Sequence, residues 1–385
     1  MVSSPAPTGH IEGDYELPPG GSLRPPPGVS GVEITGAFRA TGSGTVEGSL
    51  TCREARIEGG VLTVRGAVHV SKAVTLRHAR LRVEGDLTAG SLEGDKVVSV
   101  GGRLECPDVD IEGQVDVSGT TKGDRFEVGG WADLRGTVDL TSLDIGGKVT
   151  IGGGNVRRSI EVGGKFDTTA PLTFGSLEIG GMARLRASAQ GDSVDVGGVI
   201  DCDGDLVATR DMEVGGKIRV AGKLKAARIE VGGLLAAGSI EGEEVEVGGQ
   251  AEVTGAVAAR RMDVGGRLSA ERVVASDRVN VGDEIRTKSG IKADSLRVGD
   301  RSSVQGPIIA REVSIGDRGE VEDVWAGSLR LGERARARNV YAEELEVSAR
   351  VEIHGETQYL RSIRGEGARF GQNPRQVSQL PPAPL

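Results

Sequence analysis

Nine carboxylate residues recur at a nearly constant interval and are the most conspicuous candidates for chemistry in this chain. Each stands directly before an aliphatic residue that is followed by two glycines, and successive copies lie 16 to 18 residues apart. Carboxylates gathered in one column would bind divalent cations or a basic partner protein. The alternative interpretation is a solvated face that keeps the chain soluble. The nine residues are Glu127, Asp144, Glu161, Glu178, Asp195, Glu213, Glu230, Glu246 and Asp263.

The histidines and the glycine-rich stretches do not form recognisable catalytic or binding motifs. No constellation of cysteines or carboxylates gathers around His10, His69, His78 or His354, so we predict no catalytic site and no metal site. The glycine-rich stretches lack the GxxxxGK[ST] spacing with which a P-loop holds phosphates, so we predict no cofactor. A net charge of −9 argues against the basic surface that nucleic-acid binding requires.

The cysteines and the apolar segments predict a reduced, intracellular protein. Cys52, Cys106 and Cys202 lie far apart without a CxxC pair, which is typical of buried core residues. Residues 1–27 lack the basic and apolar regions of a secretory signal. No apolar run approaches the length of about 18 residues that a membrane-spanning helix needs. We therefore expect a cytoplasmic protein, and nothing in the sequence indicates membrane contact.

The period of the acidic residues identifies the elements that must position them. Apolar residues flank each acid, as Phe126 and Val128 flank Glu127. More apolar residues follow at four, six and ten positions after the aliphatic residue, in short alternations of period two. Such alternation predicts β-strands. Three strands within about 17 residues make one coil of a parallel β-helix, whereas an α-solenoid would need longer units with helical periodicity.

The repeat sets the expected domain bounds. We predict one continuous β-helix over residues 32–370, with a regular repeat from about residue 109 and about 19 to 20 coils in all. Residues 1–31 and 371–385 are rich in proline, which predicts disordered tails. The paired glycines are expected at corners, where glycine adopts a positive φ without strain.

After Asp263 the acidic residue moves to the place of the second glycine. This change indicates either a second face for another partner or drift of the repeat. The acids in the new place are Asp283, Asp300, Asp317 and Glu333.

Stacked coils would place the nine acids in one outward-facing column about 4.8 Å apart. Each neighbouring pair then repels by roughly 0.9 kcal/mol in a water-like dielectric. Salt and basic residues three positions after the aliphatic residue are expected to moderate this repulsion. Those basic residues are Lys148, Lys165, Lys217 and Arg267.

The end coils of a β-helix have a free strand edge. Unpaired N–H and C=O groups beside apolar side chains form a template for another copy, and monomeric solenoids need polar caps. The proline-rich tails lack the apolar periodicity of a folded cap. We therefore predict assembly surfaces at the two ends, formed by Ile34, Phe38, Leu360, Ile363 and Phe370.

Two stretches resemble the bactofilins, which are polymer-forming cytoskeletal proteins of bacteria and some archaea. They are residues 214–226, Val-Gly-Gly-Lys-Ile-Arg-Val-Ala-Gly-Lys-Leu-Lys-Ala, and residues 363–370, Ile-Arg-Gly-Glu-Gly-Ala-Arg-Phe. The resemblance covers residues 32–370 and implies a right-handed β-helix with a triangular core. It also implies non-polar filaments that form end to end without nucleotide and act as scaffolds in cell shape, polarity or envelope organisation. The β-helix of this chain is far longer than that of a typical member.

We therefore expect a non-enzymatic cytoskeletal scaffold whose main partner is another copy of itself, located in the cytoplasm or in membrane-associated cytoskeletal structures. Two alternatives stay open. One is a non-polymerising adaptor that binds partner proteins along its charged faces or through its tails. The other is a hexapeptide-repeat acyltransferase, an enzyme that is also a triangular β-helix. The period of 17 residues and the lack of a loop insertion beside a histidine disfavour the enzyme.

Overall fold

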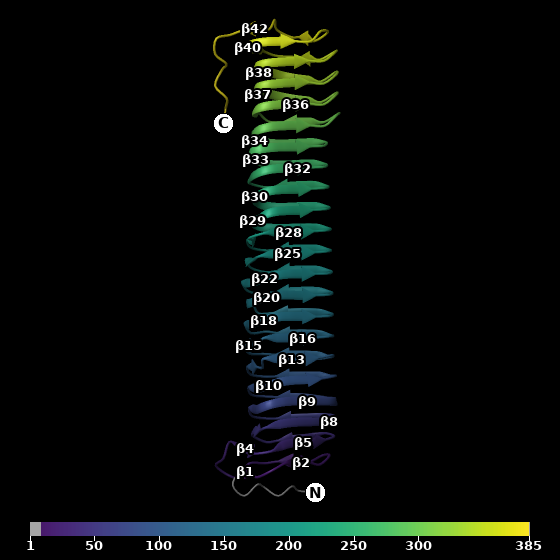
Figure 1. The fold of residues 1–385 in the computed structure, drawn as a ribbon, viewed down its shortest axis with the longest axis vertical. Helices are drawn as coiled ribbons and strands as arrows, with labels where there is room; N and C mark the ends of the chain where they lie inside the picture. Colours follow the sequence, from purple (N-terminus) through teal and green to yellow (C-terminus); the bar gives the residue numbers. More distant parts are fainter. Residues whose placement is uncertain (1–8, 385) are drawn as a thin grey trace. The chain divides into compact units, whose positions relative to one another are not determined.

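Parallel strands account for the regular structure of this chain. The computed structural model describes residues 9–384, which contain 42 strands and no helix. Strands of neighbouring coils pair in parallel and make a β-solenoid of about 20 turns with roughly 17 residues per coil (Figure 1). The all-β solenoid predicted from the repeat is confirmed. Backbone contacts divide the chain into two units, Met1–Gly191 and Asp192–Leu385, which we describe in turn.

Unit 1 contains the strands β1 to β24. Each strand pairs with the strand that lies about one coil further along the chain, as β16 does with β18. The strands are β1 (His10–Ile11), β2 (Tyr15–Leu17), β3 (Ser22–Leu23), β4 (Gly31–Ile34), β5 (Ala37–Thr41), β6 (Gly44–Val46), β7 (Ser49–Cys52), β8 (Glu54–Val64), β9 (Val68–Val83), β10 (Leu87–Gly94), β11 (Val97–Val100), β12 (Leu104–Glu105), β13 (Asp108–Ile111), β14 (Gln114–Val117), β15 (Thr121–Lys122), β16 (Arg125–Val128), β17 (Trp131–Leu134), β18 (Val138–Ile145), β19 (Lys148–Ile151), β20 (Gly154–Val162), β21 (Lys165–Thr168), β22 (Leu172–Ile179), β23 (Met182–Leu185) and β24 (Ala189–Gly191).

Unit 2 contains the strands β25 to β42, several of which run through a corner and so are longer. The strands are β25 (Ser193–Val196), β26 (Val199–Cys202), β27 (Leu206–Ala208), β28 (Asp211–Val214), β29 (Lys217–Val231), β30 (Leu234–Val247), β31 (Gln250–Val253), β32 (Ala256–Val264), β33 (Arg267–Val281), β34 (Glu284–Val298), β35 (Ser303–Gln305), β36 (Ile308–Ile315), β37 (Glu320–Leu331), β38 (Arg336–Val347), β39 (Glu352–Ile353), β40 (Thr357–Arg364), β41 (Arg369–Phe370) and β42 (Arg375–Gln376).

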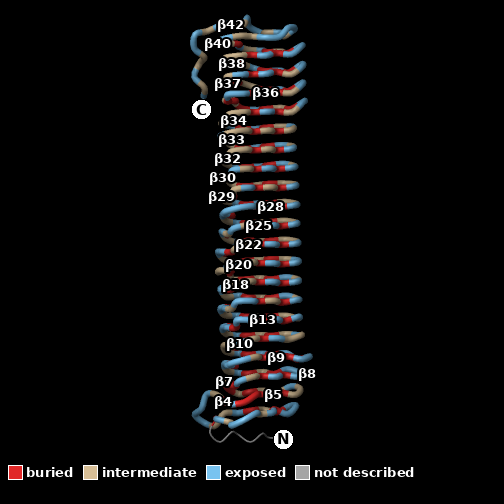
Figure 2. The backbone as a smooth tube through the Cα atoms, viewed as in Figure 1, coloured by how far each residue is buried: buried red, intermediate tan, exposed pale blue. Residues whose placement is uncertain are grey.

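Alternating side chains fill the interior of each unit. In β16, Phe126 and Val128 are buried while Arg125 is exposed. Figure 2 shows this alternation of buried and exposed residues in coil after coil. The core consists mainly of valine, isoleucine, leucine and alanine, in a chain whose aromatic content is only 3 %. Phe370, in β41, is the one phenylalanine of the described residues that is only half-buried.

The first coil begins earlier than predicted. Residues 9–31, expected to be part of a disordered arm, form β1, β2 and β3, which pair with β4, β5 and β6. Leu17 and Leu23 are buried in this coil. Pro18 and Pro19 directly follow β2, and Pro25, Pro26 and Pro27 come one residue after β3, so these prolines stand outside the strands, where no ladder N–H is needed. Residues 1–8 of the predicted arm lie outside the described residues.

The C-terminal tail also differs from the prediction of disorder. Residues 375–376 form β42, which pairs with the start of β40. Beyond it, the Val377 N–H donates a hydrogen bond to the Tyr359 carbonyl at 2.9 Å. The tail then turns back along the outer surface of unit 2 (Figure 1), where the Trp325 Nε1–H donates to the Pro381 carbonyl at 3.2 Å. Residues 371–384 therefore dock on the solenoid.

The paired glycines are needed for a different reason from the one predicted. None of the glycine pairs that follow an acid and an aliphatic residue, from Gly129–Gly130 to Gly265–Gly266, has a positive φ. Instead, the corners of neighbouring coils stack too closely for a side chain. A Cβ atom at Gly146 would lie 2.4 Å from the Gly129 carbonyl oxygen, and one at Gly163 would lie 2.4 Å from the Gly146 carbonyl oxygen. Close approach of the backbone, and not turn geometry, selects glycine here.

Unit 2 changes its corner after β34. The two-residue corner between β33 and β34 is followed by four-residue corners, beginning with residues 299–302 between β34 and β35. The third residue of each long corner adopts the left-handed conformation. These residues are Arg301 (φ 56°), Arg318 (φ 58°), Arg334 (φ 59°), Arg350 (φ 61°) and Gly367 (φ 82°).

Candidate functional site

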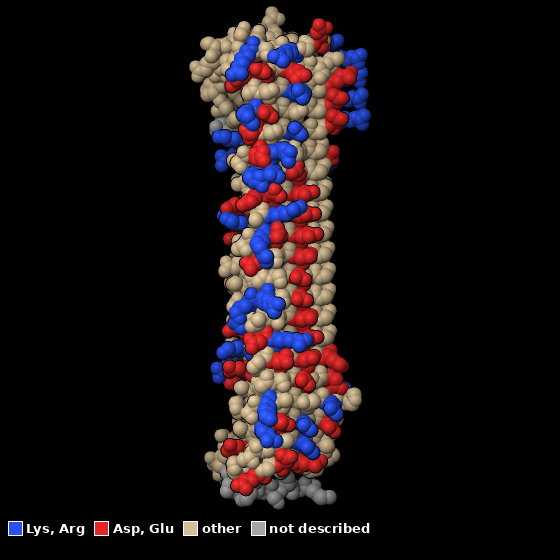
Figure 3. Space-filling model, in the orientation of Figure 1, with Lys and Arg blue, Asp and Glu red and all other residues tan. Residues whose placement is uncertain are grey.

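The predicted acidic column exists in unit 1. The strand register places Glu127 beside Asp144, Asp144 beside Glu161, and Glu161 beside Glu178. Figure 3 shows acidic side chains aligned in this way, one per coil. The same register adds Glu93 and Asp110 at the N-terminal end of the column. The sequence pattern does not reveal these two acids, because Gly94 replaces the aliphatic residue after Glu93, and Glu112 replaces the first glycine after Asp110 and Ile111.

Unit 2 carries a matching column of acids. Register places its five members next to one another in order, from Asp195 to Asp263. The column ends where Asn280 follows Asp263, and Arg297 comes next. Every acid predicted for the two columns is exposed or half-buried, so the outward direction of these side chains is as expected.

Repulsion between neighbouring acids is evident at Asp144. Burial raises the pKa of the Asp144 carboxyl, and the charges of Glu161 and Glu127 raise this pKa further. Glu127 forms an ion pair with Arg125. Within residues 9–384, no cationic side chain forms an ion pair with Asp144, Glu161 or Glu178. The middle of the column in unit 1 is therefore a line of uncompensated negative charge.

The basic residues that moderate the columns are not the predicted ones. Lys165 pairs with Asp167 at 2.9 Å and Arg267 with Glu284 at 3.7 Å, so both contact other carboxylates. Compensation comes instead from arginines two residues before an acid on the same strand. Arg125 pairs with Glu127 in unit 1, and Arg228 with Glu230 at 3.4 Å in unit 2. Side chains two apart on a strand share a face, which explains these pairs.

The second set of acids in unit 2 has a structural role. The Asp300 carboxylate accepts a hydrogen bond from the Asp317 N–H at 2.9 Å, and the Asp317 carboxylate accepts one from the Glu333 N–H at 2.7 Å. These side chains thus link successive four-residue corners. These bonds account for Asp300 and Asp317, whereas Asp283 already lies in the two-residue corner between β33 and β34.

The residues predicted for the two ends differ in their surroundings. Ile34 and Phe38 are buried inside unit 1, because the coil of β1 to β3 covers them and the Tyr15 ring stacks on Phe38 at 6.3 Å. They do not form an end surface. Leu360, Ile363 and Phe370 are half-buried in the last coil of unit 2. In the strand register, Ile363 pairs with Leu345 and Phe370 pairs with Ile353. Leu345 and Ile353 both belong to the preceding coil.

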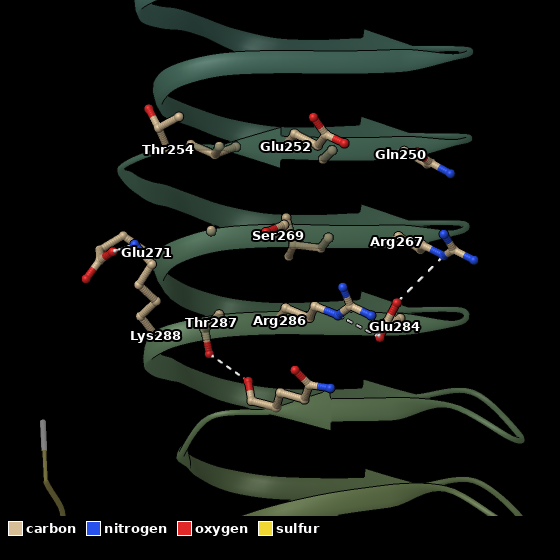
Figure 4. A pocket seen from close by; sticks show the side chains of 15 residues that line it. Gln250, Glu252, Thr254, Arg267, Ser269, Glu271, Glu284, Arg286, Thr287 and Lys288 are labelled. Carbon is tan, nitrogen blue, oxygen red and sulfur yellow. Dashed lines mark hydrogen bonds and ion pairs between the residues drawn. The ribbon is translucent and has the colours of Figure 1, made fainter.

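A groove of about 640 Å³ lies on unit 2 (Figure 4). It crosses β31, β33 and β34, and its charged side chains pair with one another. Glu284 lies 2.7 Å from Arg286 and 3.7 Å from Arg267, and Lys288 lies 3.2 Å from Glu271. Of the charged residues that line this groove, only Glu252 takes part in none of these ion pairs.

The histidines and cysteines do not add a reactive centre among the described residues. His78 forms an ion pair with Asp95 at 2.7 Å at the edge of an exposed turn. Burial raises the pKa of the Cys52 thiol to about 11 and that of Cys106 to about 12, which suppresses the reactive thiolate. Residues 9–384 hold no group of three His, Cys, Asp or Glu side chains placed to bind a metal ion.

Comparison with known proteins does not identify a family. No family model, no curated protein and no solved structure matches this chain. The described residues contain no helix of the length and apolarity needed to cross a membrane.

Proposed function

We propose that this chain is a non-enzymatic structural scaffold of the cytoplasm that self-assembles end to end into filaments without nucleotide. Its role would be in cell shape, polarity or envelope organisation, as the resemblance to bactofilins implies. The proposal rests mainly on the state of the last coil of unit 2, where the solenoid stops without a complete polar cap.

The last coil combines a free strand edge with apolar side chains. β42 covers only the start of β40, at Gln358 and Tyr359. The remainder of β40 and all of β41 pair with the preceding coil alone among the described strands. Ile363 and Phe370 lie on this edge and are half-buried, whereas the other phenylalanines of the described residues are at most 4 % exposed. Such an edge favours the addition of another strand.

The first coil of unit 1 offers the second surface in this proposal. β1, β2 and β3 pair with β4, β5 and β6 on one side. We propose this coil as the second end surface, in place of the surface predicted around Ile34 and Phe38.

Substitution of Phe370 tests end-to-end assembly. We expect Phe370→Arg to leave monomers or short particles in negative-stain electron microscopy, because a buried unpaired charge at an interface costs several kcal/mol. Gln250→Arg, which adds the same charge at an exposed position in β31, is the matched control and should leave filament length unchanged. Circular dichroism confirms that both variants keep the solenoid. Filaments of normal length from Phe370→Arg would refute the assembly surface.

The uncompensated acids of unit 1 favour a second candidate function. A non-polymerising adaptor would use Asp144, Glu161 and Glu178 to bind a basic partner protein along its side. Light scattering of the purified wild-type chain separates the two candidates. A monodisperse particle with the mass of one chain at all concentrations favours the adaptor, whereas mass that grows with concentration favours the filament.

A further inference from the structure

Two aromatic side chains form an outward-facing platform on unit 2. Trp325 in β37 and Tyr341 in β38 are neighbours in the strand register, and Ile309 precedes them in the same column. The two rings stack with centroids 4.9 Å apart and an interplanar angle of 29°. Aromatic residues make up 3 % of this chain, and here two of them share one outer face. Without a cover, this platform would expose a large apolar surface to water.

The C-terminal tail supplies that cover with a proline-rich segment. Residues 380–384 read Leu-Pro-Pro-Ala-Pro, and they form neither helix nor strand. Proline fixes its own φ and pushes the preceding residue into extended conformations, so covalent geometry favours a polyproline II conformation here. Leu380, Pro381 and Ala383 are half-buried, and the Pro381 carbonyl accepts the Trp325 indole N–H at 3.2 Å.

The contact has the components by which aromatic grooves recognise proline-rich peptides. Those components are an aromatic surface, an indole donor to a backbone carbonyl, and a ligand whose backbone is ordered before it binds. We propose that the Trp325–Tyr341 platform is a binding site for uncharged proline-rich peptide segments, and that residues 380–384 are its built-in occupant. A proline-rich segment of another protein chain is then the partner that would displace the tail.

Tethering decides how readily the tail can be displaced. The root of the tail is held by β42, by the bond from Val377 to Tyr359, and by the Gln376 side-chain amide, which donates to the Leu360 carbonyl at 2.9 Å. A short tether of this kind gives a local concentration on the order of millimolar. A free segment therefore binds weakly to the wild-type chain and more tightly when the tail is made a poor ligand.

A labelled peptide with the sequence of residues 376–384 tests the site by fluorescence anisotropy. The receptor is the full chain with Pro381→Ser, Pro382→Ser and Pro384→Ser, which keeps the length and the root of the tail. We expect saturable binding to this tail variant and at least about tenfold weaker binding to the wild-type chain, where the tethered tail competes. A peptide with the same three serines should not bind either chain.

Two further substitutions in the tail variant locate the site. Trp325→Ala should abolish binding of the peptide, whereas Trp131→Ala, at the exposed tryptophan of β17, should leave the affinity unchanged. Circular dichroism of both variants shows whether the solenoid is intact. The proposal is overturned if the tail variant does not bind, if the serine peptide binds equally well, or if Trp325→Ala keeps the affinity.

Discussion

The paired glycines determine how closely neighbouring coils approach at one corner. They looked like turn residues with positive φ in the sequence, yet their φ angles are ordinary and the constraint comes from the carbonyl of the coil before. Sequence alone could show that glycine recurs. It could not show the reason, because the distance between stacked corners is a property of the assembled coils.

Gly164→Ala tests this explanation at a single residue. A Cβ there would lie 2.5 Å from the Gly147 carbonyl oxygen, so the corner must open. We expect a loss of about 1 to 3 kcal/mol, typical of overpacking, seen as a lower unfolding midpoint by circular dichroism. Asp283→Ala is the control, because that corner position already carries a side chain. Equal effects of the two substitutions would contradict the role of close stacking.

Asp144 gives the acidic column a dependence on pH. Its pKa in the folded chain is raised by burial and by Glu161 and Glu127, so folding favours its protonated form. This preference stabilises the fold fully at a pH below 3.8, which is the ordinary pKa of an aspartate carboxyl. The stabilisation is lost as the pH rises through the higher pKa that Asp144 has in the folded chain. At neutral pH the ionised carboxylate therefore destabilises the fold.

Asp144→Asn should consequently raise the unfolding midpoint at neutral pH by a small amount, because exposed charges are partly screened. Below pH 3.8 the variant and the wild type should unfold together. Glu241→Gln is a control from outside the column, since Lys223 and Lys225 already compensate Glu241 and removal of its charge should give no gain. A benefit of Asp144→Asn that persists unchanged in acid would rule out this origin.

At the scale of elements, regular strands were easy to predict and irregular ones were not. The inward residues of β16 to β34 follow one alternation, so their burial could be read directly from the repeat. Leu17 and Leu23 escaped detection because each stands in a strand of two or three residues between prolines. The docking of the tail on Trp325 could not be predicted, because it joins residues 56 positions apart without any periodic signal.

The backbone of the four-residue corners in unit 2 is strained at one position. Their third position is left-handed, which costs an L-residue roughly 1 to 2 kcal/mol. Glycine fills this position in the last corner, at Gly367, whereas arginine fills it in the four corners before. We expect Arg318→Gly to raise the unfolding midpoint, because relief of this strain exceeds the extra chain entropy of glycine. Arg318→Ala keeps the Cβ atom and should bring no gain, so an equal gain from both would point to the side chain instead.

At the scale of the whole chain, the function that we propose depends on its terminal coils and on its outer surfaces. Phe370 lies in the last coil and stays part of a proposed end surface, whereas the coil of β1 to β3 covers Phe38 and takes its place in the proposal. The sequence could identify a solenoid with ends, since the repeat stops. It could not identify which residues occupy the first coil, because the repeat is irregular there.

The uniform coils of residues 125–191 also bear on how such a gene can change. Most strand pairs between these coils keep a constant offset of 17 residues, and bulges interrupt it only where β18 pairs with β20 and β20 with β22. Duplication of one 17-residue segment would therefore add a coil whose two faces already fit the coils around it, and deletion would remove one equally cleanly. Mutation can therefore lengthen or shorten the solenoid by one coil at a time, and the remaining coils keep their packing.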